Sequence, residues 1–141
     1  MLPTMELDLI ADRRRFMHSR TLGTYQTGIF GEDIVASQLA DEGWKALGRR
    51  VRTKWGEVDL IMRRGDMIAF VEVKVASPGR KDIWHVIDDR AQHRIRRAAV
   101  AWMAMQPRQQ RGVMHYRFDV AVVHLKTDGS VLRIDMLANA F

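Results

Sequence analysis

Apolar and polar residues alternate most regularly in the middle of the chain. Two runs rich in β-branched and large apolar side chains, residues 56–64 and 67–75, flank the pair Gly65-Asp66. This pattern predicts two antiparallel strands joined by a two-residue turn, with glycine at the first central position of a type II′ turn. The chain is therefore expected to fold back on itself at Gly65.

Two other segments carry apolar residues at the spacing of an amphipathic helix. The first covers residues 24–42, where Thr24 or Thr27 is a candidate N-cap and Gly43 a candidate C-terminal stop. The second covers residues 86–106 and ends before the next proline. One helix is thus expected before the hairpin and one after it.

Three shorter segments predict further strands. Residues 44–53 form the first of these, with an irregularity around Gly48. Residues 116–125 and 131–136 form the last two, joined by a turn at residues 127–129. Helices interspersed with strands in this order predict an α/β fold, in which a mixed β-sheet is flanked by helices.

Composition fits a single globular domain. The chain has 141 residues, of which 47% are hydrophobic and 28% charged. We expect the domain to cover residues 23–141, preceded by an extension over residues 1–22 that is either a flexible arm or a short docking helix. The chain has no apolar run of the ~20 residues that span a bilayer. Acidic residues interrupt the apolar N-terminus, unlike a secretory signal, so a cytoplasmic protein with no membrane partner is expected.

Residue types exclude several kinds of site. The chain contains no cysteine, which excludes disulfides, thiolate zinc sites and a cysteine nucleophile. Its five histidines are scattered, and no two have a spacing such as H-x-x-x-H. A histidine-based zinc site is therefore not expected.

The net charge of +6 indicates a polyanionic partner, most often nucleic acid. A basic surface that serves only solubility is the alternative. Clustering of the cations favours phosphate contacts. The two clusters are Arg49, Arg50, Arg52 and Lys54, and Arg90, Arg94, Arg96 and Arg97.

The predicted hairpin brings charged residues together. With Gly65 and Asp66 as the turn, Asp59 lies opposite Glu72 and Glu57 lies opposite Lys74. Side chains alternate between the two faces of a strand, so these four project from one face. That face is apolar near the turn, where a helix could cover it, and ionic at the open end.

Opposed carboxylates at Asp59 and Glu72 need an explanation, because directly opposed like charges destabilise a sheet. They share either a proton or a cation. Their oxygen atoms suit Mg²⁺, with the Val73 backbone carbonyl as a possible further ligand. Lys74 could orient and help deprotonate a water, or stabilise charge on a phosphate, and Glu57 could tune it by ion pairing. A surface ladder of ion pairs is the alternative, but it leaves the contact between the two acids unexplained.

Glu32 is a further candidate. It lies beside the apolar stripe of the first predicted helix and could point beneath that helix towards the sheet. Gly28 and Gly31 would let the helix approach the sheet closely. From the pattern alone, a glutamate on the exposed surface of the helix is the favoured interpretation of the two.

Three more polar residues stand out. Gln92 and Arg94 on the second predicted helix could reach the site or the phosphates, although a solvated helix face is the better explanation from the pattern. Asp119 lies inside an apolar strand, where it is expected to pair with Arg117 or another cation for structural reasons. It is given no catalytic role.

Asp59, followed after twelve residues by Glu72-Val73-Lys74, resembles the motif of the PD-(D/E)XK nuclease superfamily. More closely, the chain resembles the bacterial YraN family of predicted endonucleases, which is similar in turn to archaeal Holliday-junction resolvases. The matching segments are Gly28-x-x-Gly31-Glu32-Asp33, Gly56-Glu57-Val58-Asp59-Leu60-Ile61, Phe70-Val71-Glu72-Val73-Lys74, Arg117-Phe118-Asp119-Val120 and Asn139-Ala140-Phe141.

The resemblance implies a restriction-endonuclease-like core with a catalytic site of Glu32, Asp59, Glu72 and Lys74. It also implies Mg²⁺ or Mn²⁺, a branched or structured DNA substrate and a homodimer. The chain departs from the family at Ala91-Gln92, where members commonly carry Lys-Gln at the start of the second helix.

Together these features predict a metal-dependent endonuclease that hydrolyses phosphodiester bonds of nucleic acid, with Asp59, Glu72 and Val73 holding the metal. Two alternatives stay open: a non-catalytic nucleic-acid-binding domain that retains the fold, and an RNA-processing nuclease. The residues expected to contact nucleic acid are Arg49, Arg50, Arg52, Lys54, Gln92 and Arg94.

Overall fold

The computed structural model describes residues 24–80, 87–107 and 115–141. The N-terminal extension expected over residues 1–22 therefore lies outside the described residues. The elements along the described chain are α2 (Thr24–Asp41), β1 (Lys45–Thr53), β2 (Gly56–Arg64), β3 (Met67–Ala76), α3 (Asp89–Ala104), β4 (His115–Leu125) and β5 (Val131–Leu137). Neither helix combines the length and the apolar character needed to cross a bilayer.

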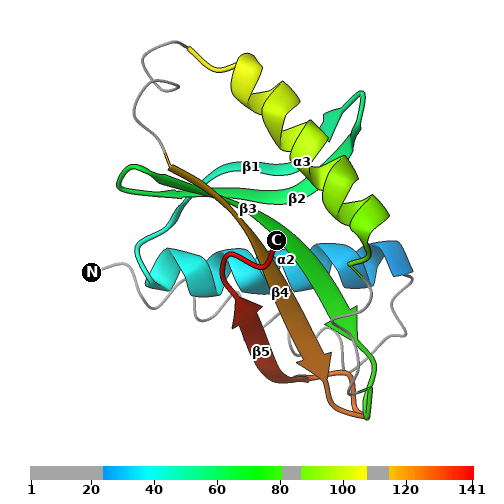
Figure 1. Cartoon of the computed structure of the whole chain (residues 1–141). Helices are drawn as coiled ribbons and strands as arrows, with labels where there is room; N and C mark the ends of the chain where they lie inside the picture. The colour runs from blue at the N-terminus through cyan, green and yellow to red at the C-terminus, as the bar shows by residue number, and fades with distance from the viewer. Residues whose placement is uncertain (1–23, 81–86, 108–114) are drawn as a thin grey trace.

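All five of these strands form one sheet, in the order β1-β2-β3-β4-β5. Neighbouring strands are antiparallel except β3 and β4, which are parallel and are separated in the chain by α3. Helix α2 lies across one face of the sheet and α3 across the other (Figure 1). The predicted α/β fold with a mixed sheet is confirmed.

Helix α2 ends where the sequence predicts, at a glycine in the left-handed region. Gly43 has φ 90°. Its N–H donates to the Ala40 carbonyl at 3.0 Å, and the Trp44 N–H donates to the Leu39 carbonyl at 2.9 Å. This pair of bonds is a Schellman motif, which satisfies carbonyls that the end of a helix leaves unpaired.

Trp44 follows this helix end, and its side chain is buried. It lies outside the strand predicted over residues 44–53, because β1 begins one residue later, at Lys45. Its ring lies 4.6 Å from the Arg64 guanidinium carbon and 4.9 Å from that of Arg117. Two cations thus stack on one buried ring, on the face of the sheet that α2 covers.

The hairpin between β2 and β3 has the predicted turn. Its register runs from Arg64 opposite Met67 to Leu60 opposite Val71. Gly65 has a positive φ of 62° and Asp66 a negative φ. This is the combination of a type II′ turn. The register of β1 shifts between Ala46 and Gly48, so the irregularity expected at Gly48 is also present.

Helix α3 is shorter than the predicted segment 86–106. It begins at Asp89 because the Asp88 side chain accepts a hydrogen bond from the Ala91 N–H at 2.8 Å, which makes Asp88 the N-cap. It ends at Ala104, where turn bonds from the next two N–H groups replace the helical pattern.

The sheet is covered on both faces. On the face under α3, Phe70 meets Trp102 edge to face with ring centroids 5.9 Å apart, so a helix does cover the apolar half of this face. Val58 also lies in this cluster, although strict alternation from Leu60 predicts the opposite face. Strand β2 therefore loses its regular alternation between these two residues. On the face under α2, the buried residues are Val35, Ala36, Leu39, Trp44, Leu60, Met62, Ala69, Val71, Ala121 and Val123.

Gly31 sets the distance between α2 and the sheet. A Cβ atom at this position would lie 2.6 Å from Val75 Cγ2 and 3.5 Å from Val73 Cγ1. A β-branched side chain in a strand cannot turn aside easily. The close approach expected from glycine at this position is therefore present.

We predict that Gly31→Ala lowers the free energy of unfolding by about 1–3 kcal/mol through overpacking, measured by urea unfolding. Gly28→Ala is the matched control. A Cβ there would meet only the flexible end of Arg50, at 3.0 Å, so its effect should be small. Adding Val75→Ala should recover part of the loss at Gly31. Equal effects of the two glycine variants would contradict the prediction.

Candidate functional site

The candidate site lies where β2 and β3 part. Their ladder ends at Leu60 and Val71. Continued for two more residues, the same register would bring the Val73 N–H to the Val58 carbonyl. Instead, Asp59 Oδ2 accepts the Val73 N–H at 2.9 Å. A side-chain carboxylate thus takes the place of the missing strand partner.

The Val73 carbonyl faces the same region. In a β-strand, the N–H and C=O of one residue point towards the same neighbouring strand. Because the N–H of Val73 reaches Asp59, its carbonyl oxygen also points to the side that β2 has left. One carboxylate and one backbone carbonyl therefore converge at this opening.

Glu72 and Lys74 occupy alternate positions on β3 and so share a face of the strand. Lys74 Nζ lies 3.0 Å from Glu72 Oε1. The Glu72 side chain is only 8% exposed, and that of Lys74 is 30% exposed. The Lys74 ammonium group therefore forms an ion pair with the buried carboxylate of Glu72.

Asp59 has a strongly perturbed acidity. Burial, the negative charge of Glu72, that of Glu32 and a hydrogen bond with the Glu72 carboxyl together raise the pKa of Asp59 to about 7, against an opposing effect of the Val73 N–H. The two acids therefore meet as the sequence predicts. Near neutral pH, Asp59 is therefore only partly ionised.

Glu32 projects from α2 into the protein and is only 6% exposed. Its Oε2 lies 2.7 Å from Nε of Arg50, a residue held at a positive φ of 46° in β1. The effect of Glu32 on the pKa of Asp59 indicates that the two carboxylates are near neighbours. Glu32 therefore points inward, the orientation that the sequence pattern alone favoured less than a position on the helix surface.

Glu57 does not contact Lys74, so the expected tuning of the lysine by this residue is wrong. Because β2 has parted from β3 at this point, Glu57 Oε2 pairs with Nε of Arg52 on β1 at 3.3 Å. Lys74 pairs instead with Glu72, two residues before it on the same strand.

The residues predicted to contact nucleic acid divide into two groups. Three pair with acids: Arg49 with Asp33 at 2.7 Å, and Arg50 and Arg52 as described above. The other three have different contacts. Lys54 lies over the Trp55 ring, Gln92 donates to the Ile87 carbonyl, and the side chain of Arg94 packs where a Cβ of Gly56 would lie.

Asp119 has the structural role expected of it. Its Oδ2 pairs with Arg117 Nη2 at 3.0 Å, and its Oδ1 accepts the Asn139 N–H at 2.9 Å. A fully buried carboxylate with both oxygens bound ties β4 to the chain that follows β5.

The donor set of the site fits a hard divalent cation. Asp59, Glu72 and the Val73 carbonyl offer only oxygen ligands, the kind that Mg²⁺ and Mn²⁺ prefer, and Mg²⁺ needs only one or two carboxylates. Across the part of the chain that the structure describes, no three His, Cys, Asp or Glu side chains are grouped as a metal site. Lys74 and Arg50 instead neutralise two of the acids.

Trp55 is the feature that sequence reasoning missed. It is 42% exposed at the turn between β1 and β2, and the guanidinium of Arg97 lies 4.7 Å from its ring. The available signal was a tryptophan next to Lys54, between two strands and ahead of an arginine-rich helix. The contact itself depends on how α3 crosses the sheet, which the pattern does not give.

Fold and site together define an α/β protein with a mixed sheet, consistent with a restriction-endonuclease-like core that carries a carboxylate pair at a strand opening. Residues 31–123 match the family described as "Uncharacterised protein family UPF0102", also known as YraN. The chain belongs to this family, and the matched segment contains Glu32, Asp59, Glu72 and Lys74.

The chain aligns with other proteins of the same family over most of their length. The chain is 35% identical to a UPF0102 protein of Synechococcus sp. (strain JA-3-3Ab) over 127 residues, which covers 86% of this chain and 94% of the relative. It is 42% identical over 105 residues to one from Rhizorhabdus wittichii, covering 74% and 86%. It is 39% identical over 99 residues to one from Mesorhizobium japonicum, covering 70% and 77%.

We predict that Asp59→Asn stabilises the protein more at alkaline than at acidic pH. The unfolded carboxyl titrates near 3.8 and the folded one at about 7. The native state thus holds a proton that the unfolded chain releases, and this contribution to stability is lost as pH rises towards 7. Melting temperatures of both proteins at about pH 5 and about pH 8.5 measure the difference.

Asp41→Asn, an exposed acid at the end of α2, is the control and should change the melting temperature little at either pH. A difference between wild type and Asp59→Asn that stays constant with pH would contradict the raised pKa of Asp59.

Proposed function

We propose that this protein is a metal-dependent endonuclease that hydrolyses phosphodiester bonds of nucleic acid, with branched or structured DNA as its substrate. One observation carries the proposal: the buried carboxyl groups of Asp59 and Glu72 meet beside Lys74, and the pKa of Asp59 is raised to about 7. Two buried acids in contact reduce stability, so their presence needs a chemical purpose.

In the proposed site, Asp59, Glu72 and the Val73 carbonyl hold Mg²⁺ or Mn²⁺. Such an ion, when bound, supplies positive charge that polarises a phosphate oxygen and offsets the charge of the transition state. Asp59 must first release the proton that it holds near neutral pH. The Val73 N–H fixes the orientation of its carboxylate through the hydrogen bond to Oδ2.

Lys74 acts beside the carboxylates. Its ammonium stabilises negative charge on the phosphoryl oxygens or orients the attacking water. Glu32 lies near Asp59 and is restrained by Arg50, so it adds negative charge to the site from the helix side. These four residues are the catalytic set that the resemblance to PD-(D/E)XK nucleases implies.

The substrate is assigned from charge and resemblance. A net charge of +6 favours a polyanion. The similarity to archaeal Holliday-junction resolvases favours branched DNA and a homodimer over structured RNA. A cytoplasmic location fits a nuclease of this kind. The proposed contacts to the sugar-phosphate backbone of the nucleic acid are Arg49, Arg52, Lys54, Gln92 and Arg94.

A second candidate is a nucleic-acid-binding domain that keeps the fold without catalysis. It is favoured by the ion pairs of Lys74 with Glu72 and of Arg50 with Glu32, because these cations already neutralise two of the three acids. Cleavage assays separate the two candidates.

We predict metal-dependent cleavage of at least one substrate in a panel of four-way junctions, flaps, single strands and structured RNA. Asp59→Asn and Lys74→Met should each lower the cleavage rate about 100-fold or more, because each removes charge that acts on the phosphate. Glu57→Gln is the control: its exposed pair with Arg52 lies outside the carboxylate pair, so cleavage should persist.

Binding without cleavage by the wild-type protein in both Mg²⁺ and Mn²⁺ would instead support the non-catalytic domain. Preferred cleavage of RNA would identify an RNA-processing nuclease with the same chemistry.

We also predict that Mg²⁺ or Mn²⁺ raises the melting temperature of the wild-type protein by several degrees, since an ion that binds only the native state stabilises it. The shift should be larger above pH 7, where Asp59 has lost its proton, and should disappear in Asp59→Asn. An equal shift in wild type and variant would place the ion elsewhere.

A further inference from the structure

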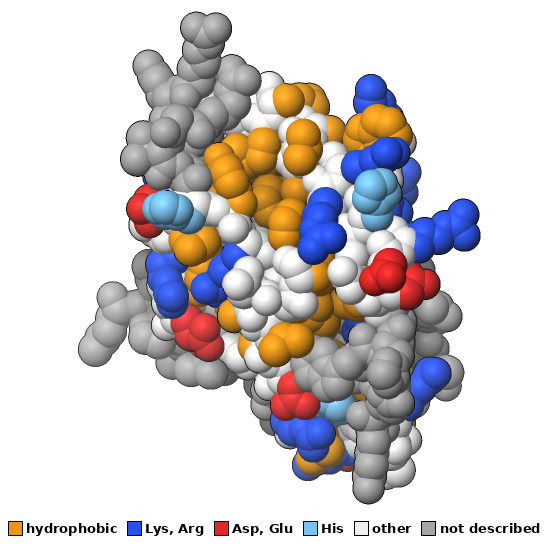
Figure 2. Space-filling view, in the orientation of Figure 1, with side chains coloured by type: hydrophobic (Ala, Val, Ile, Leu, Met, Phe, Trp, Pro, Cys, Tyr) orange, Lys and Arg blue, Asp and Glu red, His pale blue; other side chains and the backbone are white. Residues whose placement is uncertain are grey.

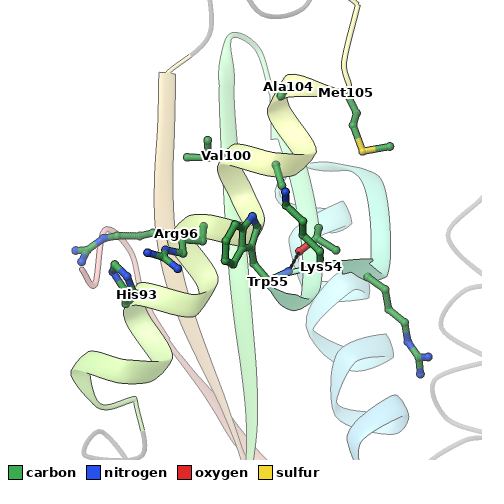
Figure 3. Close-up of a pocket in the computed structure, with 11 residues that line it drawn as sticks. Lys54, Trp55, His93, Arg96, Val100, Ala104 and Met105 are labelled. Atoms are coloured by element: carbon green, nitrogen blue, oxygen red, sulfur yellow. Dashed lines mark hydrogen bonds between the residues drawn. The ribbon is translucent and has the colours of Figure 1, made fainter.

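An open groove of about 970 Å³ lies between α3 and the turn that joins β1 to β2. Its floor is apolar, with Val100, Ala101 and Ala104 of α3. Figure 3 shows the Trp55 ring lying against α3, with Arg96 on one side and Lys54 on the other. A large aromatic ring is thus presented at the surface between cationic side chains.

Trp55 is held in place, although it is 42% exposed. The backbone N–H of Trp55 donates to Thr53 Oγ1 at 3.1 Å, and the Thr53 hydroxyl donates to the Gly56 carbonyl at 2.9 Å. Gly56 has φ 137°, and a Cβ there would lie 2.8 Å from the side chain of Arg94. The turn therefore presents the ring on a braced backbone, which lowers the entropy lost on binding.

The charges around the ring are all of one sign. Arg97 and Lys54 lie 4.7 Å and 5.1 Å from the ring centroid, and Arg52 and Arg96 also line the groove. None of the described lining residues is acidic. In the orientation of Figure 2, hydrophobic side chains reach the surface in the upper part of the molecule, and Lys and Arg side chains lie to the right of them. An apolar floor with a cationic border fits a ligand that combines flat apolar rings with negative charge.

We propose that this groove binds an unpaired strand of nucleic acid, with a base stacked on Trp55 and phosphates on Arg96, Arg97 and Lys54. Base faces are available for stacking only when the base is unpaired, so a duplex fits the groove poorly. The Lys54 ammonium leaves the ring when a base stacks there and becomes available to a phosphate. An acidic peptide is the competing occupant, but it would leave the exposed ring without a flat partner.

The groove lies beside the candidate site. Trp55 precedes β2 directly, and Asp59 lies four residues further on, about 13 Å along an extended strand. A strand that stacks on Trp55 is thus within reach of the carboxylates. This link, which rests on the proposed nuclease function, assigns as substrate a nucleic acid with an unpaired segment next to the cut, such as a flap or a splayed junction.

The test measures binding of a labelled oligothymidine of about twelve nucleotides by fluorescence anisotropy in EDTA, so that no metal takes part. Trp55→Ala should weaken binding roughly tenfold to a hundredfold through loss of stacking, whereas Trp55→Phe should keep most of it. Arg96→Ala combined with Arg97→Ala should reduce the slope of log Kd against log salt by about 1.4.

Two matched controls come from outside the groove. Leu132→Ala removes an exposed apolar side chain, 54% exposed on β5, and Lys126→Ala removes an exposed cation after β4. Neither should change Kd more than about twofold. The fluorescence test uses a Trp84→Phe background, because Trp84 lies outside the described residues. Binding should quench tryptophan fluorescence in that background and not when Trp55→Phe is added, because Trp44 and Trp102 are buried.

Oligothymidine binding that is unchanged in Trp55→Ala would overturn the proposal, as would displacement of the label by an acidic peptide but not by unlabelled oligothymidine. The outcome is separable from that for the nuclease. Normal oligothymidine binding without cleavage refutes only the nuclease, and cleavage with no effect of Trp55→Ala on binding refutes only the groove.

Discussion

The site depends on one hydrogen bond, from the Val73 N–H to Asp59 Oδ2. A backbone N–H inside a protein requires an acceptor, and Val73 loses its strand partner where β2 leaves β3. Asp59 supplies the acceptor, and this brings its carboxylate into a buried position next to Glu72. The raised pKa of Asp59 follows from that position. A requirement of backbone pairing thereby brings two carboxyl groups together in a buried position.

The surrounding elements balance this charge without removing it. Lys74 neutralises Glu72 from the same strand, and Arg50 neutralises Glu32 across the space between β1 and α2. Among the described residues, Lys74 pairs with Glu72 and Arg50 with Glu32, whereas Asp59 accepts a hydrogen bond from a backbone N–H. It is therefore the acid whose charge is least compensated and the one at which a divalent cation would change the electrostatics most.

Much of this arrangement could be predicted from local sequence. Turn chemistry at Gly65 fixes the register of the hairpin as far as Leu60 and Val71, so Asp59 and Glu72 are the next residues on the two strands. The error at Glu57 arises because a two-strand extrapolation assumes that the ladder continues, whereas Glu57 lies opposite Arg52 of β1, beyond the end of the ladder between β2 and β3. The Arg50–Glu32 pair and the Trp55 groove depend on how helices cross the sheet. Periodicity within a segment carries no information on such crossings.

The stacking of Arg64 and Arg117 on Trp44 affects how the molecule would meet a polyanion. Those two cations lie on the face under α2, where Arg49 and Arg50 are also matched by acids of the helix. The opposite face carries the arginines of α3. Within the described residues, α3 carries four arginines, Arg90, Arg94, Arg96 and Arg97, and one acid, Asp89. A polyanion that approached this side of the molecule would therefore be attracted before any contact formed.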